Sequence, residues 1–186
     1  IFEGLGKRDS VSWAALLSAC VQSGYPEAAL SLFRDEQNEI LKPGGITLIS
    51  VLLACAELSY LKLGMSIHCY ALKANNASDI SFGTALVSMY AKCGSIEEAY
   101  QMFNGMNSRD CISWNAIISA HALHGEGNKA LSLFESMKGE GFAPDELTLL
   151  ATLQACSYNG LWETGLRVFN EMEPKYGTKS GIEHFA

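Results

Sequence analysis

Apolar positions recur along most of the chain with the spacing of an α-helix. Between residues 12 and 21 they fall three or four positions apart, which favours an amphipathic helix. Gly24 then interrupts the pattern, and Pro26 suits the first position of a new helix, where the backbone N–H has no intrahelical partner. Residues 26–33 continue with a second apolar face. The pattern therefore predicts a hairpin of two short antiparallel helices.

The same pattern returns four more times. The predicted helix pairs are 47–56 with 60–74, 82–92 with 95–103, 113–123 with 128–138, and 147–158 with 162–172. Ser95 is followed three residues later by Glu98, which predicts a capping box. Small residues at the crossings, such as Ala19 and Ala120, favour close helix packing. One hairpin cannot bury its apolar face alone, so we expect an all-α stack of hairpins, an α-α solenoid.

The sequence also repeats over a longer period of 101 residues, which spans several of these helix pairs. Ser12-Trp13 returns as Ser113-Trp114, and Ala54-Cys55 returns as Ala155-Cys156. From Arg8 to Gly64, 21 of 57 positions are identical to their counterpart 101 residues later. Unrelated sequences would match at roughly 3–4 of these positions. The chain is therefore a repeat array, and we look for its function on a surface that repeats build together.

Composition excludes several classes of function. The formal charge of −7 argues against a generally basic nucleic-acid binder, because neutralising phosphates requires Lys and Arg. No apolar run is long enough to span a membrane. The six cysteines form no C-x-x-C pair, so we expect buried thiols and no zinc. The combination of H-x-E with C-x-x-C that zinc deaminases use is missing, and so is a glycine-rich phosphate loop. We expect this segment to hold no catalytic residues, no metal and no cofactor.

Several strings of residues carry a family resemblance. They are VSW at 11–13, MSIHCYALK at 65–73, ALVSMYAKCGSIEEA at 85–99 and ISWNAIISA at 112–120. The chain resembles the pentatricopeptide repeat family, in its plant form with alternating standard, long and short repeats. The resemblance implies a right-handed superhelix of antiparallel helix-turn-helix repeats. The first residue is not Met, and the tail from Leu153 resembles the last long repeat, so we expect a fragment near the C-terminal end of the repeat array.

The resemblance also sets a register. Residues 10–44 form a standard repeat, 45–79 a long one, 80–110 a short one, 111–145 a standard one and 146–181 a long one. Residues 1–9 end a preceding short repeat, and residues 182–186 start a further short repeat. One standard, one long and one short repeat together span 101 residues, which accounts for the observed period.

Family members bind single-stranded RNA at about one base per repeat, read mainly by the fifth and the last residue of each repeat. By this analogy Thr84 and Asp110 favour guanine, while Asn115 and Asp145 favour uracil. Their short polar side chains carry donors or acceptors suited to a Watson–Crick edge. The family runs parallel to its RNA, so the resemblance implies a 5′-GU-3′ step. Asp is also a common turn residue or cap, and Thr84 and Asn115 have the alternative of capping a helix.

Other positions have weaker assignments. The second residue of a repeat flanks the base in the family; the residues there are Val11, Ile46, Ile112 and Leu147. Ordinary helix packing is an equal alternative for these four. Lys92 is placed for a phosphate contact, with a solvated side chain as the alternative. The pair Ala14/Gly44 cannot form the usual polar pair, and the long-repeat pairs Ile49/Asp79 and Leu150/Gly181 are interpreted as spacers.

The resemblance implies recognition of organellar transcripts, in a mitochondrion or a chloroplast, as the address for C-to-U RNA editing. Editing-factor proteins or a deaminase domain would then be partners, and the chain itself would not be an enzyme. Two alternatives remain open at this stage. One is a role in splicing or transcript stabilisation. The other is a protein-binding solenoid of the tetratricopeptide type, which the acidic balance favours.

Overall fold

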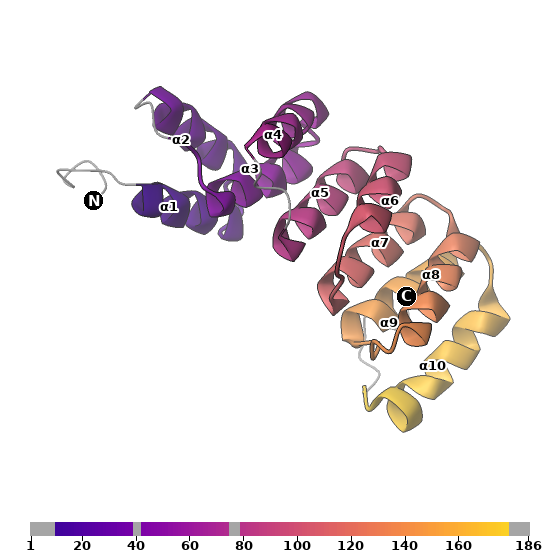
Figure 1. The fold of residues 1–186 in the computed structure, drawn as a ribbon. Helices are drawn as coiled ribbons and strands as arrows, with labels where there is room; N and C mark the ends of the chain where they lie inside the picture. The colour runs from indigo at the N-terminus through magenta and orange to yellow at the C-terminus, as the bar shows by residue number, and fades with distance from the viewer. Residues whose placement is uncertain (1–9, 39–41, 75–78, 179–186) are drawn as a thin grey trace. The chain divides into compact units, whose positions relative to one another are not determined.

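The computed structural model describes residues 10–38, 42–74 and 79–178, which form ten α-helices and no strand (Figure 1). The helices are α1 Ser10–Gln22, α2 Pro26–Asn38, α3 Gly45–Leu58, α4 Leu61–Lys73, α5 Ile80–Lys92, α6 Ile96–Gly105, α7 Cys111–Leu123, α8 Gly127–Gly139, α9 Glu146–Tyr158 and α10 Trp162–Tyr176. The predicted all-α class and the predicted helical hairpins are confirmed. The first helix of each hairpin begins at the first residue of a repeat in the predicted register.

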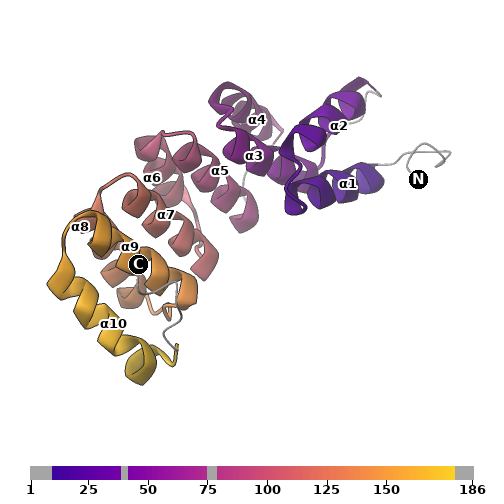
Figure 2. The same ribbon diagram turned by 180° about the vertical axis from the view of Figure 1, so that it is seen from behind.

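Packing divides the chain into two compact units, residues 1–93 and 94–186. In the first unit α3 lies between α1 and α5, and α2 and α4 pack against this layer. In the second unit α7 lies beside α9, and α6, α8 and α10 pack on these two helices (Figure 2). Each unit is therefore a two-layered stack, in which the first helices of successive repeats are neighbours.

The turns between the helices fall at the glycine and proline positions where the sequence predicts a helix to end or begin. Gly24 and Gly125 have φ values of 78° and 76°, in the left-handed region that glycine adopts without a Cβ clash. Pro26 occupies the first position of α2, as its missing N–H allows. Tight turns of this kind hold the two helices of a hairpin antiparallel.

The interior repeats with the period of the sequence. Trp13 and Trp114 are both buried, and so are Phe33 and Phe134, which stand at the equivalent positions of the second helix. In the second unit the rings of Phe103 and Trp114 meet edge to face, with centroids 4.7 Å apart. Burying such rings removes a large apolar area from water, and this favours stacking of the hairpins.

Two expectations about single residues fail. Ser95 is the N-cap of α6 but makes no side-chain capping bond, because its ψ of 70° departs from the extended conformation that a capping box uses. Ala19 is exposed, whereas its counterpart Ala120 is buried. The difference has a simple cause: α6 packs on α7, and no described helix precedes α1.

The cysteines also differ from the expectation of buried thiols. Cys55 and Cys156 are buried, Cys69 is exposed, and all six are free. Burial, together with the neighbouring Cys93, raises the pKa of the Cys55 thiol to about 12. Among the described helices, none is long and apolar enough to cross a membrane. The predicted segments 1–9 and 182–186, and Gly181, lie outside the described residues.

Candidate nucleic-acid interface

A shallow groove of about 270 Å³ lies between α7 and α9. We call it the second groove, because a related groove lies earlier in the chain and is described below. The residues that line the second groove include Ile112, Asn115, Ser119, Leu147 and Gln154. Ile112 is 67% exposed and Leu147 is 63% exposed, so these aliphatic side chains do not serve ordinary helix packing. Both stand at the second residue of their helix. They form two apolar walls suited to the faces of a planar base.

Three polar side chains from α7 and the start of α9 meet beside these walls. The amide Nδ2 of Asn115 donates to the Asp145 carboxylate, at 2.9 Å from Oδ1 and 3.0 Å from Oδ2. The Thr148 hydroxyl donates to Oδ1 of Asn115. Asp145 also accepts from the backbone N–H of Thr148 at 2.9 Å, so the carboxylate caps α9 while it holds Asn115. We call Asn115, Asp145 and Thr148 the polar triad.

Within the polar triad the amide of Asn115 keeps unused hydrogen-bonding capacity. Asn115 is 8% exposed. Its amide group has two N–H donors and an oxygen with two lone pairs. The carboxylate takes one N–H and Thr148 takes one lone pair, which leaves one donor and one acceptor. A base edge carries the same kind of donor and acceptor pair.

Asp145 remains charged in this setting. Partial burial raises the pKa of its carboxyl group, but the hydrogen bonds from the Thr148 backbone, the Thr148 hydroxyl and the Asn115 amide lower the pKa by more. The net effect is a pKa below the usual value for Asp. Asp145 therefore acts only as an acceptor at neutral pH, which fixes the direction of its bond to Asn115.

A related groove of about 430 Å³ lies between α1 and α3, and we call it the first groove. Val11 and Ile46, which are 73% and 64% exposed, form its apolar walls. Ala14 and Gly44 occupy the places that Asn115 and Asp145 hold in the second groove. Thr47, the counterpart of Thr148, is fully buried, and its hydroxyl has no hydrogen-bond partner. The first groove thus has the walls without the polar triad.

The other predicted pair is divided between the units. Thr84 lies on α5 in the first unit, and its buried hydroxyl has no hydrogen-bond partner. Asp110 precedes α7 in the second unit. Its carboxylate accepts from the backbone N–H of Ser113 at 2.8 Å, and the Ser113 hydroxyl completes a capping box. Asp110 therefore caps α7, which was the alternative interpretation of this residue. The Thr84 hydroxyl makes no hydrogen bond and so caps no helix.

Lys92 and the long-repeat positions are less distinctive. The Lys92 ammonium donates to the Glu57 carboxylate, and both side chains are about half exposed. Exposed ion pairs of this kind contribute little, about 0–1 kcal/mol, so the pair leaves Lys92 available to a phosphate. Ile49 and Leu150 are half-buried and carry no hydrogen-bonding group. Within the described residues, no three His, Cys, Asp or Glu side chains gather in a way that could hold a metal.

Sequence reasoning missed Thr148. A buried threonine in an apolar stretch gave no sign of a bond to Asn115, which precedes it by 33 residues. One signal was present: Thr47 and Thr148 are identical across the 101-residue period, and both are fully buried. Most buried hydroxyl groups are hydrogen-bonded, so a threonine expected to be buried is a reason to search for its hydrogen-bond partner.

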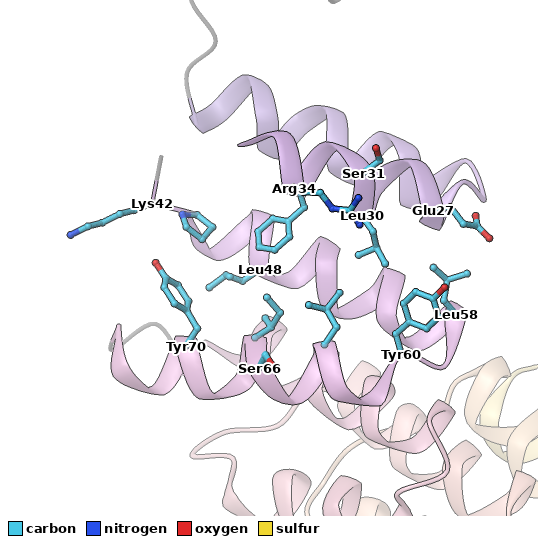
Figure 3. Close-up of a pocket in the computed structure, with 14 residues that line it drawn as sticks. Glu27, Leu30, Ser31, Arg34, Lys42, Leu48, Leu58, Tyr60, Ser66 and Tyr70 are labelled. Atoms are coloured by element: carbon cyan, nitrogen blue, oxygen red, sulfur yellow. The ribbon is translucent and has the colours of Figure 1, made fainter. Parts of the chain in front are cut away.

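A separate apolar hollow of about 900 Å³ lies on the first unit, between α2 and α4, with α3 as its floor (Figure 3). The side chains of Leu30, Leu48 and Tyr60 point into it. Leu48 follows Ile46 by two residues, which places the two side chains on nearly opposite sides of α3 because each helical residue turns by about 100°. This hollow is therefore distinct from the first groove.

The fold and the repeated grooves define a helical repeat protein of the solenoid class. The PPR repeat family matches at residues 109–157, and single PPR repeats match at 11–35, 84–111 and 151–173. The chain belongs to the pentatricopeptide repeat family.

Curated relatives come from Arabidopsis thaliana. The putative pentatricopeptide repeat-containing protein At3g23330 is 44% identical over the whole chain, which covers 26% of that protein. The chloroplastic protein CRR2 is 39% identical over the whole chain, which covers 29% of it. The mitochondrial protein At3g53360 is 40% identical over 95% of the chain, which covers 23% of it. The chain thus spans about a quarter of the length of these relatives.

Solved structures show the same fold at low identity. The maize pentatricopeptide repeat protein PPR10 covers 96% of the chain with a TM-score of 0.64 and 20% identity, over 26% of its own length. The PPR domain of Arabidopsis thaliana protein-only RNase P 1, solved in complex with tRNA, covers 94% with a TM-score of 0.69 and 17% identity, over 95% of its own length. PPR10 has also been solved with an 18-nt psaJ RNA element.

Proposed function

We propose that this chain binds single-stranded RNA and that the second groove reads one uracil. The observation that carries the proposal is the polar triad placed beside two exposed aliphatic walls. Ile112 and Leu147 contact the two faces of the base, and Asn115 offers its free donor and acceptor to the Watson–Crick edge. The RNA complexes of PPR10 and of the RNase P PPR domain support RNA as the class of ligand.

Guanine on the 5′ side is the second part of the proposal. This part rests on the family register alone, which assigns the base to Thr84 and Asp110. Few basic side chains are available to neutralise phosphates in a chain of net charge −7. We therefore expect base contacts to supply a larger share of the affinity than in a basic RNA-binding protein.

A direct test measures binding of the 186-residue chain to short RNAs that differ only at one position. The chain should prefer uracil at the position that follows guanine, and Asn115→Ala should remove the preference. Gln154→Ala is the matched control, because Gln154 lines the same groove outside the polar triad. Equal binding of all four bases by the folded wild-type chain would overturn the proposal, and binding to no RNA would favour a protein-binding solenoid.

The biological setting is a further proposal. Relatives named chloroplastic and mitochondrial support an organelle as the location. The alternation of standard, long and short repeats supports a role as the address for C-to-U editing, with the chemistry supplied by a deaminase domain or by partner proteins. Sequencing organellar transcripts from a plant that lacks the protein would test this: loss of C-to-U changes downstream of GU-containing sites supports editing, and altered splicing or transcript ends would contradict it.

A further inference from the structure

Thr148 stands apart from the residues that the family register assigns to base reading. It is the third residue of the following long repeat, it is fully buried, and it contacts both members of the reading pair. Its hydroxyl oxygen accepts from the backbone N–H of Asp145 at 3.2 Å. The single hydroxyl proton has two acceptors within reach, Oδ1 of Asn115 at 2.5 Å and Oδ1 of Asp145 at 2.9 Å, and the contact to Asn115 is the shorter. This arrangement bears on the orientation of the Asn115 amide.

Orientation of the amide decides between uracil and cytosine. The two pyrimidines have the same shape, but donor and acceptor are exchanged between them at N3 and at the exocyclic group. Rotating a side-chain amide by half a turn exchanges its own donor and acceptor in the same way. An amide free to rotate would therefore accept either base, whereas an amide held in one orientation discriminates between them.

Two contacts hold the Asn115 amide in one orientation. The Asp145 carboxylate requires a donor opposite it, and this requirement places Nδ2 on that side. The Thr148 hydroxyl donates, and this places Oδ1 on the other side. A rotated amide would set its oxygen against the carboxylate and lose the bond from Thr148. We infer that Thr148 is a positioning residue that fixes the amide of Asn115 and thereby sets the preference of the second groove for uracil over cytosine.

This inference rests on the proposed function and deepens it. The backbone N–H of Thr148 caps α9 through Asp145, and a side-chain substitution keeps that bond. The substitution does remove the other half of the capping box, the bond from the Asp145 N–H to the hydroxyl, so its effect on α9 is measured separately by thermal unfolding. Thr47 supplies the matched control, because its hydroxyl is equally buried but has no partner.

The experiment compares binding of the 186-residue chain to two RNAs that carry uracil or cytosine at the position of the second groove. Thr148→Val should lower the ratio of uracil to cytosine affinity about fivefold, the change expected for one neutral hydrogen bond. Thr148→Ser should restore the ratio, and Thr47→Val should leave it unchanged. Thermal unfolding of each variant establishes that it is folded.

The outcomes separate the inference from the proposed function. Wild-type discrimination that persists unchanged in folded Thr148→Val would overturn the inference and leave the proposed function standing. A wild-type chain without preference for uracil would overturn both. Loss of affinity for both RNAs by the same factor, with the ratio kept, would assign Thr148 a purely structural role and would also overturn the inference.

Discussion

The first and second grooves have equivalent apolar walls, but only the second groove has the polar triad. Val11 and Ile46 in the first groove are exposed to the same extent as Ile112 and Leu147 in the second. The space between the walls is about 430 Å³ in the first groove and about 270 Å³ in the second, where larger side chains replace Ala14 and Gly44. Under the proposed function, the comparison separates two tasks: the walls would hold a base of any kind, and the polar triad would choose one.

Removing the polar pair from the second groove should have the largest effect. Asn115→Ala combined with Asp145→Gly reproduces the first groove, so uracil should lose its advantage over the other bases. A well-placed pair of hydrogen bonds to a base is worth about 1–3 kcal/mol of discrimination, or about 5- to 150-fold in affinity. Competition binding with RNAs varied at this position measures the change, and a preference that survives in the folded variant would contradict the comparison.

The reverse exchange should transfer the preference. Ala14→Asn combined with Gly44→Asp gives the buried Thr47 hydroxyl the partners that Thr148 has. A new preference for uracil should appear three nucleotides on the 5′ side of the existing one, since three repeats separate the two sites. Selection from a random RNA pool detects it. If the new preference appears at no fixed distance, the assignment of one repeat per base is wrong.

Substitutions in the walls should lower affinity without changing base choice. Val11→Ser and Ile112→Ser each remove an apolar contact to a base face, which should cost no more than the lower end of the range for base–aromatic stacking, about 1 kcal/mol. Both side chains are exposed, so unfolding free energies should change little. Equal losses for all four bases support the division of tasks. A loss confined to one base would assign reading to the walls.

The preference for uracil should not depend on pH between 5.5 and 8. Hydrogen bonds hold the pKa of Asp145 below its usual value. A carboxyl group with a lowered pKa stays ionised, and keeps its contribution to stability, until the pH falls through that lowered value. The ratio of uracil to cytosine affinity at pH 5.5 and pH 7.5 checks this. A ratio that falls at pH 5.5 would mean that the carboxylate is protonated and the triad is broken.

The smallest effect is expected at Lys92. Lys92→Ala removes a surface pair with Glu57 and one potential phosphate contact. Affinity should fall slightly and equally for all RNAs, and the slope of log affinity against log salt should decrease by about 0.7. Binding titrations at several salt concentrations measure this slope, and an unchanged slope would remove Lys92 from the interface.

The sequence predicted the helical hairpins well because their signals are local. Glycine turns, Pro26 and the helical spacing of apolar residues act within a few positions of the chain. Ser95 shows the limit of local signals: its spacing to Glu98 suits a capping box, yet its ψ of 70° prevents one, whereas Asp145 with ψ −179° forms one. Ser95 lies in the tight turn between the two helices of one repeat, whereas Asp145 lies between repeats, and the spacing of residues alone does not distinguish these two settings.

The candidate site was predictable only in part. Asn115 and Asp145 were chosen from the family register, and the structure brings them together across 30 residues. The exposure of Ile112 could not be predicted from the sequence, because an apolar residue at helical spacing fits a core equally well. Thr148 depends on a contact across two repeats, which single-residue patterns do not show.

The central claim, that the polar triad selects one uracil, is tested most directly by selecting a random single-stranded RNA pool on this chain and sequencing the bound molecules. The control is the Asn115→Ala variant, selected in parallel. The account predicts uracil at one fixed position, preceded by guanine, in the wild-type pool and loss of that uracil alone in the control pool. Identical enrichment by both folded proteins would contradict it.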